Sequence, residues 1–199
     1  QRARWEPLYE VTQIKGDGET HPMLSPTDEF ADHETLELGN LNLTVPKTPE
    51  MLKYEYARKA LKDGLKMETT LGANPYKFGM VGSSDTHTAL AAVEEENYIG
   101  KHAGTEPSPD RIDHPMAEFE GRRYEGWSMS SSGYAAVWAT GNTRKELWDA
   151  MARKEVYATT GPRMTVRFFG GWNYTEADAA NRLPAEVGYS KGVPMGGDL

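Results

Sequence analysis

Glycine and proline divide this chain into short segments. The 199 residues include 20 glycines and 12 prolines, about one residue in six, and both types interrupt regular structure. Strand-like apolar runs lie between these breaks, at residues 8–15, 77–81, 134–140, 156–159 and 164–169. Helical spacing of apolar residues marks residues 48–65 and the stretch that begins at Thr143. Because strands and helices alternate, we expect an α/β fold, either a sheet or a barrel.

The segments between these elements are predicted to be irregular. Residues 19–49 contain prolines that would interrupt any long helix. Residues 88–97 fit a short helix, and residues 100–115 fit a long loop of the kind that often carries function. The last twelve residues, 188–199, hold four glycines and a proline, which is not typical of the end of a folded domain.

Composition excludes several classes of protein. The net charge is −8 and the pI is about 5.2, which argues against a nucleic-acid partner, since nonspecific binding needs a basic face. No apolar run approaches 18 residues, so we expect no membrane span. Cysteine is absent, so any metal must use histidine and carboxylate ligands. A chain without cysteine suits the cytoplasm and the periplasm equally well, so the compartment stays open.

A carboxylate-x-histidine pattern occurs twice. Glu19 and His21 follow the first predicted strand, and Asp85 and His87 follow the second. In an extended backbone, residues i and i+2 point to the same side, so each pair can present an oxygen and a nitrogen together. Ligands bind outside the carboxyl ends of parallel strands. We therefore expect both pairs to meet there and to hold zinc, manganese or iron.

Each candidate has a structural alternative that the sequence leaves open. Asp85 could cap a helix while His87 bonds to the backbone, and Glu19 and His21 could lie in a solvated turn. His102, in the long loop, is a candidate for lining the site. Arg163 follows a glycine turn and is a candidate for binding an anionic substrate, although salt bridges would explain it equally well.

Long motifs resemble a known family. The chain is similar to the uncharacterised DUF3604 family over nearly its whole length, and the similarity is carried by RWEPLYEVTQIKGDGETHP, SPTDEFADHE, GMVGSSDTH, YAAVWATGNTRKELWDAMARKEVYATTGPRM and GYSKGVPMGGDL. That family in turn resembles the PHP superfamily, named for polymerase and histidinol phosphatase. The resemblance implies part of a distorted PHP-type β/α barrel with long irregular loops, and a metal cluster at the strand ends.

The resemblance also assigns residues. The late Asp-x-His metal motif of the superfamily matches Asp85 and His87, and its mid-chain histidine ligand matches His21, with Glu19 beside it. The opening His-x-His pair has no match in these residues. We therefore expect residues 1–199 to be a single domain that is an internal fragment of a longer PHP-like chain, lacking the N-terminal His-x-His strand and a C-terminal region.

The resemblance implies metal-dependent hydrolysis, with a phosphoester as the first candidate substrate. Asp85 and His87 would be ligands, Glu19 a ligand or a base, and His21 a further ligand, while Arg163 and His102 would bind a small anionic substrate. One alternative is a non-catalytic domain that binds a ligand or partner, and another is hydrolysis of a non-phosphate ester or amide. If the chain is a fragment, its exposed sheet edges would favour a homo-oligomer.

Overall fold

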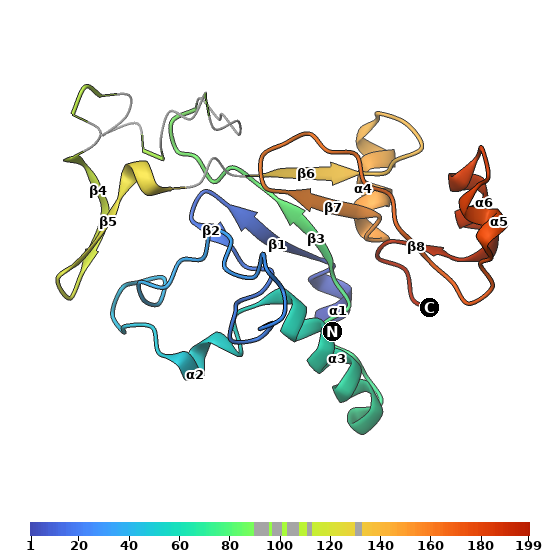
Figure 1. The fold of residues 1–199 in the computed structure, drawn as a ribbon, viewed down its shortest axis with the longest axis horizontal. Helices are drawn as coiled ribbons and strands as arrows, with labels where there is room; N and C mark the ends of the chain where they lie inside the picture. The colour runs from blue at the N-terminus through green and yellow to red at the C-terminus, as the bar shows by residue number, and fades with distance from the viewer. Residues whose placement is uncertain (90–95, 97–100, 103–107, 111–112, 130–132) are drawn as a thin grey trace.

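The central strands of the fold lie side by side and place the ends of distant segments at one edge. The computed structural model describes residues 1–89, 96, 101–102, 108–110, 113–129 and 133–199 (Figure 1). Its helices are α1 (Arg2–Trp5), α2 (Pro49–Leu52), α3 (Ala57–Leu71), α4 (Arg144–Ala152), α5 (Glu176–Ala179) and α6 (Pro184–Lys191). Its strands are β1 (Leu8–Gln13), β2 (Gly16–Asp17), β3 (Gly79–Gly82), β4 (Pro115–Phe119), β5 (Arg122–Glu125), β6 (Tyr134–Val137), β7 (Val156–Thr159), β8 (Phe169–Gly170) and β9 (Val193–Pro194).

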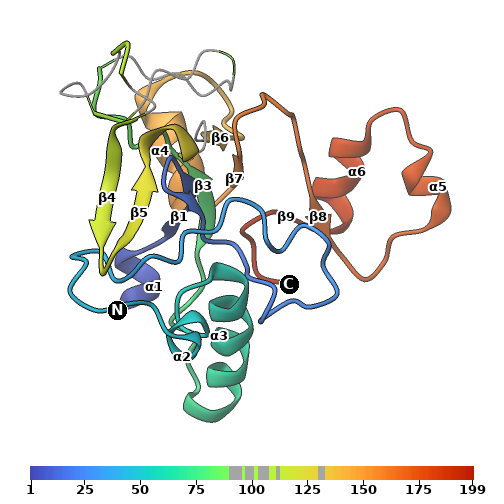
Figure 2. The same ribbon diagram turned by 60° about the vertical axis from the view of Figure 1, so that its left-hand side comes forward.

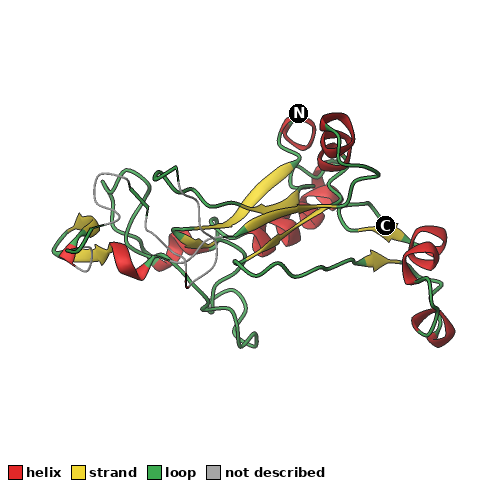
Figure 3. Cartoon of the chain, turned by 90° about the horizontal axis from the view of Figure 1, so that it is seen from above, coloured by secondary structure: helices red, strands yellow, loops and turns green. Residues whose placement is uncertain are grey.

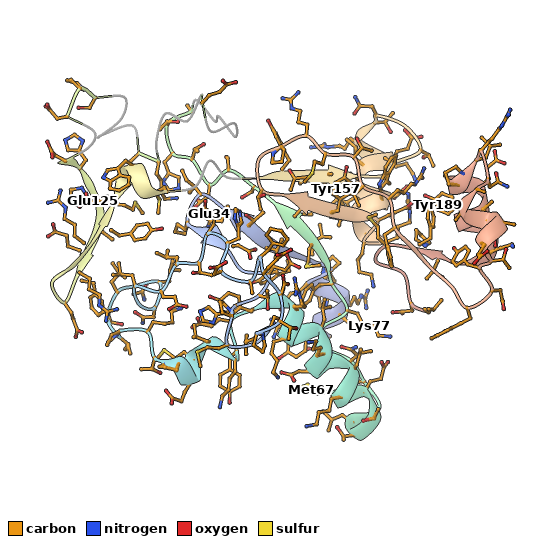
Figure 4. All side chains as sticks on the ribbon, in the orientation of Figure 1. Glu34, Met67, Lys77, Glu125, Tyr157 and Tyr189 are labelled. Carbon is orange, nitrogen blue, oxygen red and sulfur yellow. The ribbon has the colours of Figure 1, made fainter. Side chains whose placement is uncertain are left out.

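The first sheet has the order β2-β1-β3. Strands β1 and β3 are parallel, with Leu8 opposite Gly79, whereas β1 and β2 form an antiparallel hairpin. Gly16 turns this hairpin with a φ of 122°, a value that few residues other than glycine adopt. Glu34 lies beside this hairpin (Figure 4). Its main-chain carbonyl oxygen lies against Gly16 and accepts a hydrogen bond from the Asp17 amide at 2.8 Å. A Cβ at position 16 would meet that oxygen, so the turn requires glycine.

Strands β6 and β7 pair antiparallel and continue the layer beside β3. Gly79 lies against Val156 and Gly82 against Thr159, so β7 runs in the same direction as β1 and β3. Helix α4 lies behind β6 and β7 (Figures 1 and 2). It begins where Thr143 accepts a hydrogen bond from the Glu146 amide, as the sequence predicts.

Two further pairs of strands lie at opposite ends of the molecule. The β4–β5 hairpin forms one end, and β8 and β9 pair beside α5 and α6 at the other (Figure 3). The buried core is small and is drawn from several elements, and Ile14 is its only large side chain with less than 2% exposure among the described residues. No helix in the described ranges is long and apolar enough to cross a membrane.

The expectation that the chain forms part of a PHP-type β/α barrel is wrong. The described strands form separate sheets of two or three strands, and these do not close into a barrel. A barrel needs each strand to be followed by a crossover helix and a parallel neighbour. Here β1 instead turns back through Gly16 into β2, and only β1 and β3 are hydrogen-bonded in parallel among the described strands. The broader expectation of a mixed α/β fold is confirmed.

Several element boundaries also differ from expectation. The helix predicted over 48–65 is interrupted after α2 and resumes as α3 at Ala57. The strand predicted over 164–169 is reduced to β8, and Phe168 is 66% exposed, because no partner strand is paired with residues 164–168 in the described structure. The glycine-rich end folds into α6 and β9. Most of the helix predicted over 88–97 lies outside the described residues.

Candidate functional site

The carboxyl ends of β1, β3 and β7 lie at one edge of the central layer. Lys15 follows β1, Asp85 follows β3, and Arg163 follows β7. Main-chain bonds hold this edge together: the Ser83 amide donates to the Thr12 carbonyl at 3.0 Å, and the Gly133 amide donates to the Ser83 carbonyl at 3.1 Å. Ligands commonly bind at such an edge, which makes its side chains the first candidates for a site.

Asp85 is the centre of this edge. Its φ of 47° places it in the left-handed region, which is uncommon for a residue with a side chain. Its carboxylate oxygen Oδ2 accepts hydrogen bonds from Lys15 and from Lys101, the latter at 2.6 Å. The Lys101 ammonium also donates to the main-chain oxygen of Asp85 at 2.7 Å. One carboxylate oxygen is thus shared by two cations.

The two lysines keep the Asp85 carboxylate ionised. Burial alone would raise the pKa of Asp85, but the hydrogen bonds and charges of Lys101 and Lys15 outweigh it and hold the pKa well below its usual range. Burial lowers the pKa of Lys101, and the charge of Lys15 acts in the same direction, while Asp85 opposes both. The edge therefore sets two lysines against one carboxylate.

His87 and His102 complete the cluster. The Nε2 atom of His87 lies 3.2 Å from the other Asp85 oxygen, Oδ1. The two imidazole rings meet edge to face with 4.9 Å between their centroids. The His87 amide donates to the Lys101 carbonyl at 2.6 Å, and the segments of His87 and His102 form a parallel bridge. Burial, followed by the charges of His87 and Lys101, lowers the pKa of His102, which favours a neutral imidazole at pH 7.

Glu19 lies in a different set of contacts. The β1–β2 hairpin carries the chain back along β1, where the Gly18 amide bonds to the Val11 carbonyl at 2.6 Å. The Glu19 carboxylate accepts a hydrogen bond from Arg58 of α3 at 2.6 Å, and the same guanidinium bonds Asp28 at 2.6 Å. Glu19 therefore ties the loop after β2 to the start of α3.

Both ring nitrogens of His21 have partners. Its Nδ1 accepts from the Met23 amide at 3.1 Å, and its Nε2 contacts the Glu37 carboxylate. Its ring lies against Tyr56, with 5.5 Å between centroids. The structure brings Asp85, His87 and His102 together, whereas Glu19 contacts Arg58 and His21 contacts Met23 and Glu37.

Arg163 packs on the first residue of β6. Its guanidinium lies over the Tyr134 ring, 5.3 Å from the centroid, and contacts the Tyr134 hydroxyl at 3.4 Å. Because β7 runs parallel to β3, this places Arg163 at the same strand-end edge as Asp85. The geometry is compatible with an anion-binding role at that edge.

The sequence analysis did not single out Lys15 and Lys101. Lys15 directly follows the first strand, where a strand-end argument could have found it. Lys101 lies in no recognisable motif and contacts Asp85, which is 16 residues away in the chain, so only the folded chain identifies it. Its side chain is 5% exposed, which is rare for lysine without a charged partner.

The donor atoms at this edge match part of a metal site. One carboxylate oxygen and imidazole nitrogens are ligands that zinc, manganese and iron accept. However, no three histidine, aspartate or glutamate side chains of the described residues are grouped closely enough to hold an ion. Asp85 and His87 thus form a donor pair, and a complete coordination shell needs further ligands.

Comparison with known proteins identifies the family. A family model described as "Protein of unknown function (DUF3604)" matches residues 1–199. The chain belongs to the DUF3604 family. No curated protein and no solved structure matches this DUF3604 chain. The further resemblance to the PHP superfamily therefore stays a prediction.

Proposed function

We propose that this DUF3604 chain acts in metal-dependent hydrolysis of a small anionic ester, with a phosphoester as the first candidate. The observation that carries the proposal is the cluster of Asp85, His87, His102 and two lysines at the shared carboxyl ends of parallel strands. Carboxylates and imidazoles gathered at such an edge, with perturbed pKa values, are typical of catalytic sites.

The charges of the chain's own residues suit an anionic substrate. Lys15 is partly exposed, with 28% of its side chain accessible, so its ammonium can contact a bound anion. Arg163 is a second candidate contact because guanidinium groups bind phosphate oxygens in pairs. Cations fixed beside a reacting ester stabilise the negative charge that develops on it.

Asp85 and His87 are the residues that would hold a divalent ion. Such an ion, when bound, lowers the pKa of a water molecule and makes it a nucleophile near neutral pH. Asp85 is ionised across the physiological range, as a ligand must be. A neutral His102 can accept a proton at its ring or supply a further nitrogen ligand.

A second candidate function is anion binding without hydrolysis. It is favoured by the saturation of Asp85 Oδ2 with two ammonium groups and by the incomplete donor group among the described residues. In this case the lysines hold the ligand, and Asp85 serves to position them.

The experiment measures metal content and hydrolysis in the purified protein. Metal would be counted by mass spectrometry, and p-nitrophenyl phosphate, its diester and p-nitrophenyl acetate would be assayed with zinc, manganese and ferrous iron. We expect bound metal and phosphoester cleavage, and a loss of at least tenfold in both for Asp85→Ala and His87→Ala. Asp32→Ala and His33→Ala remove the same residue types from exposed positions and should change neither.

The outcomes separate the alternatives. Metal content and cleavage that survive both Asp85→Ala and His87→Ala overturn the site assignment. Cleavage of p-nitrophenyl acetate alone supports a hydrolase but overturns the phosphoester as its substrate. Phosphate binding in calorimetry without metal or turnover replaces the enzyme with the anion-binding function.

A further inference from the structure

We propose that Lys101 is a positioning residue that holds the segment Asp85-Thr86-His87 in the shape that binds the cation. This inference rests on the proposed function, because it concerns the same site. Two lysines contact the same carboxylate oxygen of Asp85. Their other contacts differ, and this difference separates a lysine that positions the segment from one that only supplies a positive charge.

Lys101 makes three contacts with the segment. Its ammonium donates to Asp85 Oδ2 at 2.6 Å and to the Asp85 carbonyl oxygen at 2.7 Å. Its own main-chain carbonyl accepts from the His87 amide at 2.6 Å. A single residue therefore fixes the side chain and the main chain of Asp85 and the main chain of His87.

The backbone of Asp85 needs such support. Its left-handed φ of 47° is unfavourable for a residue with a Cβ, and such conformations persist where surrounding contacts enforce them. The ammonium on the Asp85 carbonyl is one of these contacts. Because the Lys101 side chain is 5% exposed, water cannot readily replace it.

These contacts hold the Asp85 carboxylate in one orientation. Oδ2 is committed to the lysines, and Oδ1 is left facing His87 Nε2 at 3.2 Å. These two donor atoms, one oxygen and one nitrogen, thus lie side by side. Groups that hydrogen-bond a ligating carboxylate commonly orient it, and their loss weakens metal binding by about 10- to 100-fold.

Lys15 provides a matched comparison. Its ammonium contacts the same oxygen, Oδ2, but no contact of Lys15 with the main chain of Asp85 or His87 is found in the described structure. Lys15 therefore contributes a charge, whereas Lys101 contributes a charge and also fixes the main chain of Asp85 and His87. Removing a positive charge next to a cation site should strengthen cation binding, whereas removing a positioning contact should weaken it.

The test compares Lys101→Met with Lys15→Met. Manganese binding would be measured by electron paramagnetic resonance, together with kcat and KM for the ester and thermal unfolding. We expect Lys101→Met to weaken manganese binding by at least tenfold. Lys15→Met should leave manganese affinity unchanged or increase it, while KM for the anionic substrate rises.

A chemical rescue checks that the ammonium itself is responsible. These 199 residues contain no cysteine, so in Lys101→Cys the thiol is unique among them and can be alkylated with bromoethylamine during refolding. The product carries an ammonium on a chain of nearly the original length. Manganese affinity should return with this group and not with a neutral ethyl adduct, and the adduct pair also serves if Lys101→Met does not fold.

Each result has a distinct meaning. Manganese binding by Lys101→Met that equals the wild type, or that becomes tighter as for Lys15→Met, overturns the positioning role. Rescue by the neutral adduct overturns the role of the ammonium. A wild-type protein that binds no manganese, zinc or iron refutes the proposed function instead, and this is established before any Lys101 variant is compared.

Discussion

Truncation of Ile14 is the sharpest test of how the fold supports the strand-end edge. Ile14 is completely buried and directly precedes Lys15. Ile14→Ala removes three carbons, each with a transfer free energy of about 0.8 kcal/mol, so the transfer cost is about 2.4 kcal/mol. The cavity left behind raises the cost, and we expect the free energy of unfolding to fall by about 3 to 4 kcal/mol.

The assay is urea unfolding followed by tryptophan fluorescence. For a chain of this length, about 3 to 4 kcal/mol corresponds to a fall in Tm of roughly 6 to 16 °C. Ile14→Val should cost about 1 kcal/mol. Leu65→Ala is the control, because Leu65 is 64% exposed, and it should change stability by no more than about 0.5 kcal/mol. The reasoning is refuted if Ile14→Ala costs less than about 1 kcal/mol with an unchanged denaturant slope.

Three further predictions concern local structure. Thr143→Ala should destabilise by about 1 kcal/mol in urea unfolding, because the amide of Glu146 loses its cap, and Thr143→Ser should restore it. Burial, with a smaller effect of the Glu19 charge, raises the pKa of Asp17 to about 6, so its contribution to stability is full below about pH 4 and is lost as the pH rises through about 6. Asp17→Asn should flatten this dependence, and after allowance for solvent screening it should stabilise by about 1 kcal/mol at pH 7; an unchanged pH profile would contradict the assignment. Gly133→Ala should cost about 1 to 3 kcal/mol in the same unfolding assay, because its Cβ would meet a β7 carbonyl oxygen.

The elements with strong local signals could be predicted from the sequence. Strand β1 and helix α4 appear where the apolar pattern and the Thr143 cap place them. The sequence analysis did not predict the β4–β5 hairpin. Gly121 makes the turn of this hairpin with a φ of 74°. Its strands carry mostly exposed or half-buried residues, so they lack the apolar alternation that identifies a strand.

The candidate site could be predicted only in part. The strand-end argument located Asp85 and His87, because β3 does end just before them. The same argument treated Glu19 as a strand-end residue, but the Gly16 turn reverses the chain and brings Lys15 to the edge instead. Lys101 depends on contacts between segments that no local pattern encodes.

The ion pair between Lys15 and Asp85 joins residues 70 positions apart in the chain. Closing a loop of that length is slow relative to forming a helix or a hairpin. A partly folded chain that has α3 and α4 but has not paired β1 with β3 would therefore have no assembled cluster. Recovery of ligand binding during refolding should consequently lag behind recovery of helical circular dichroism, so ligand binding would report when β1 pairs with β3.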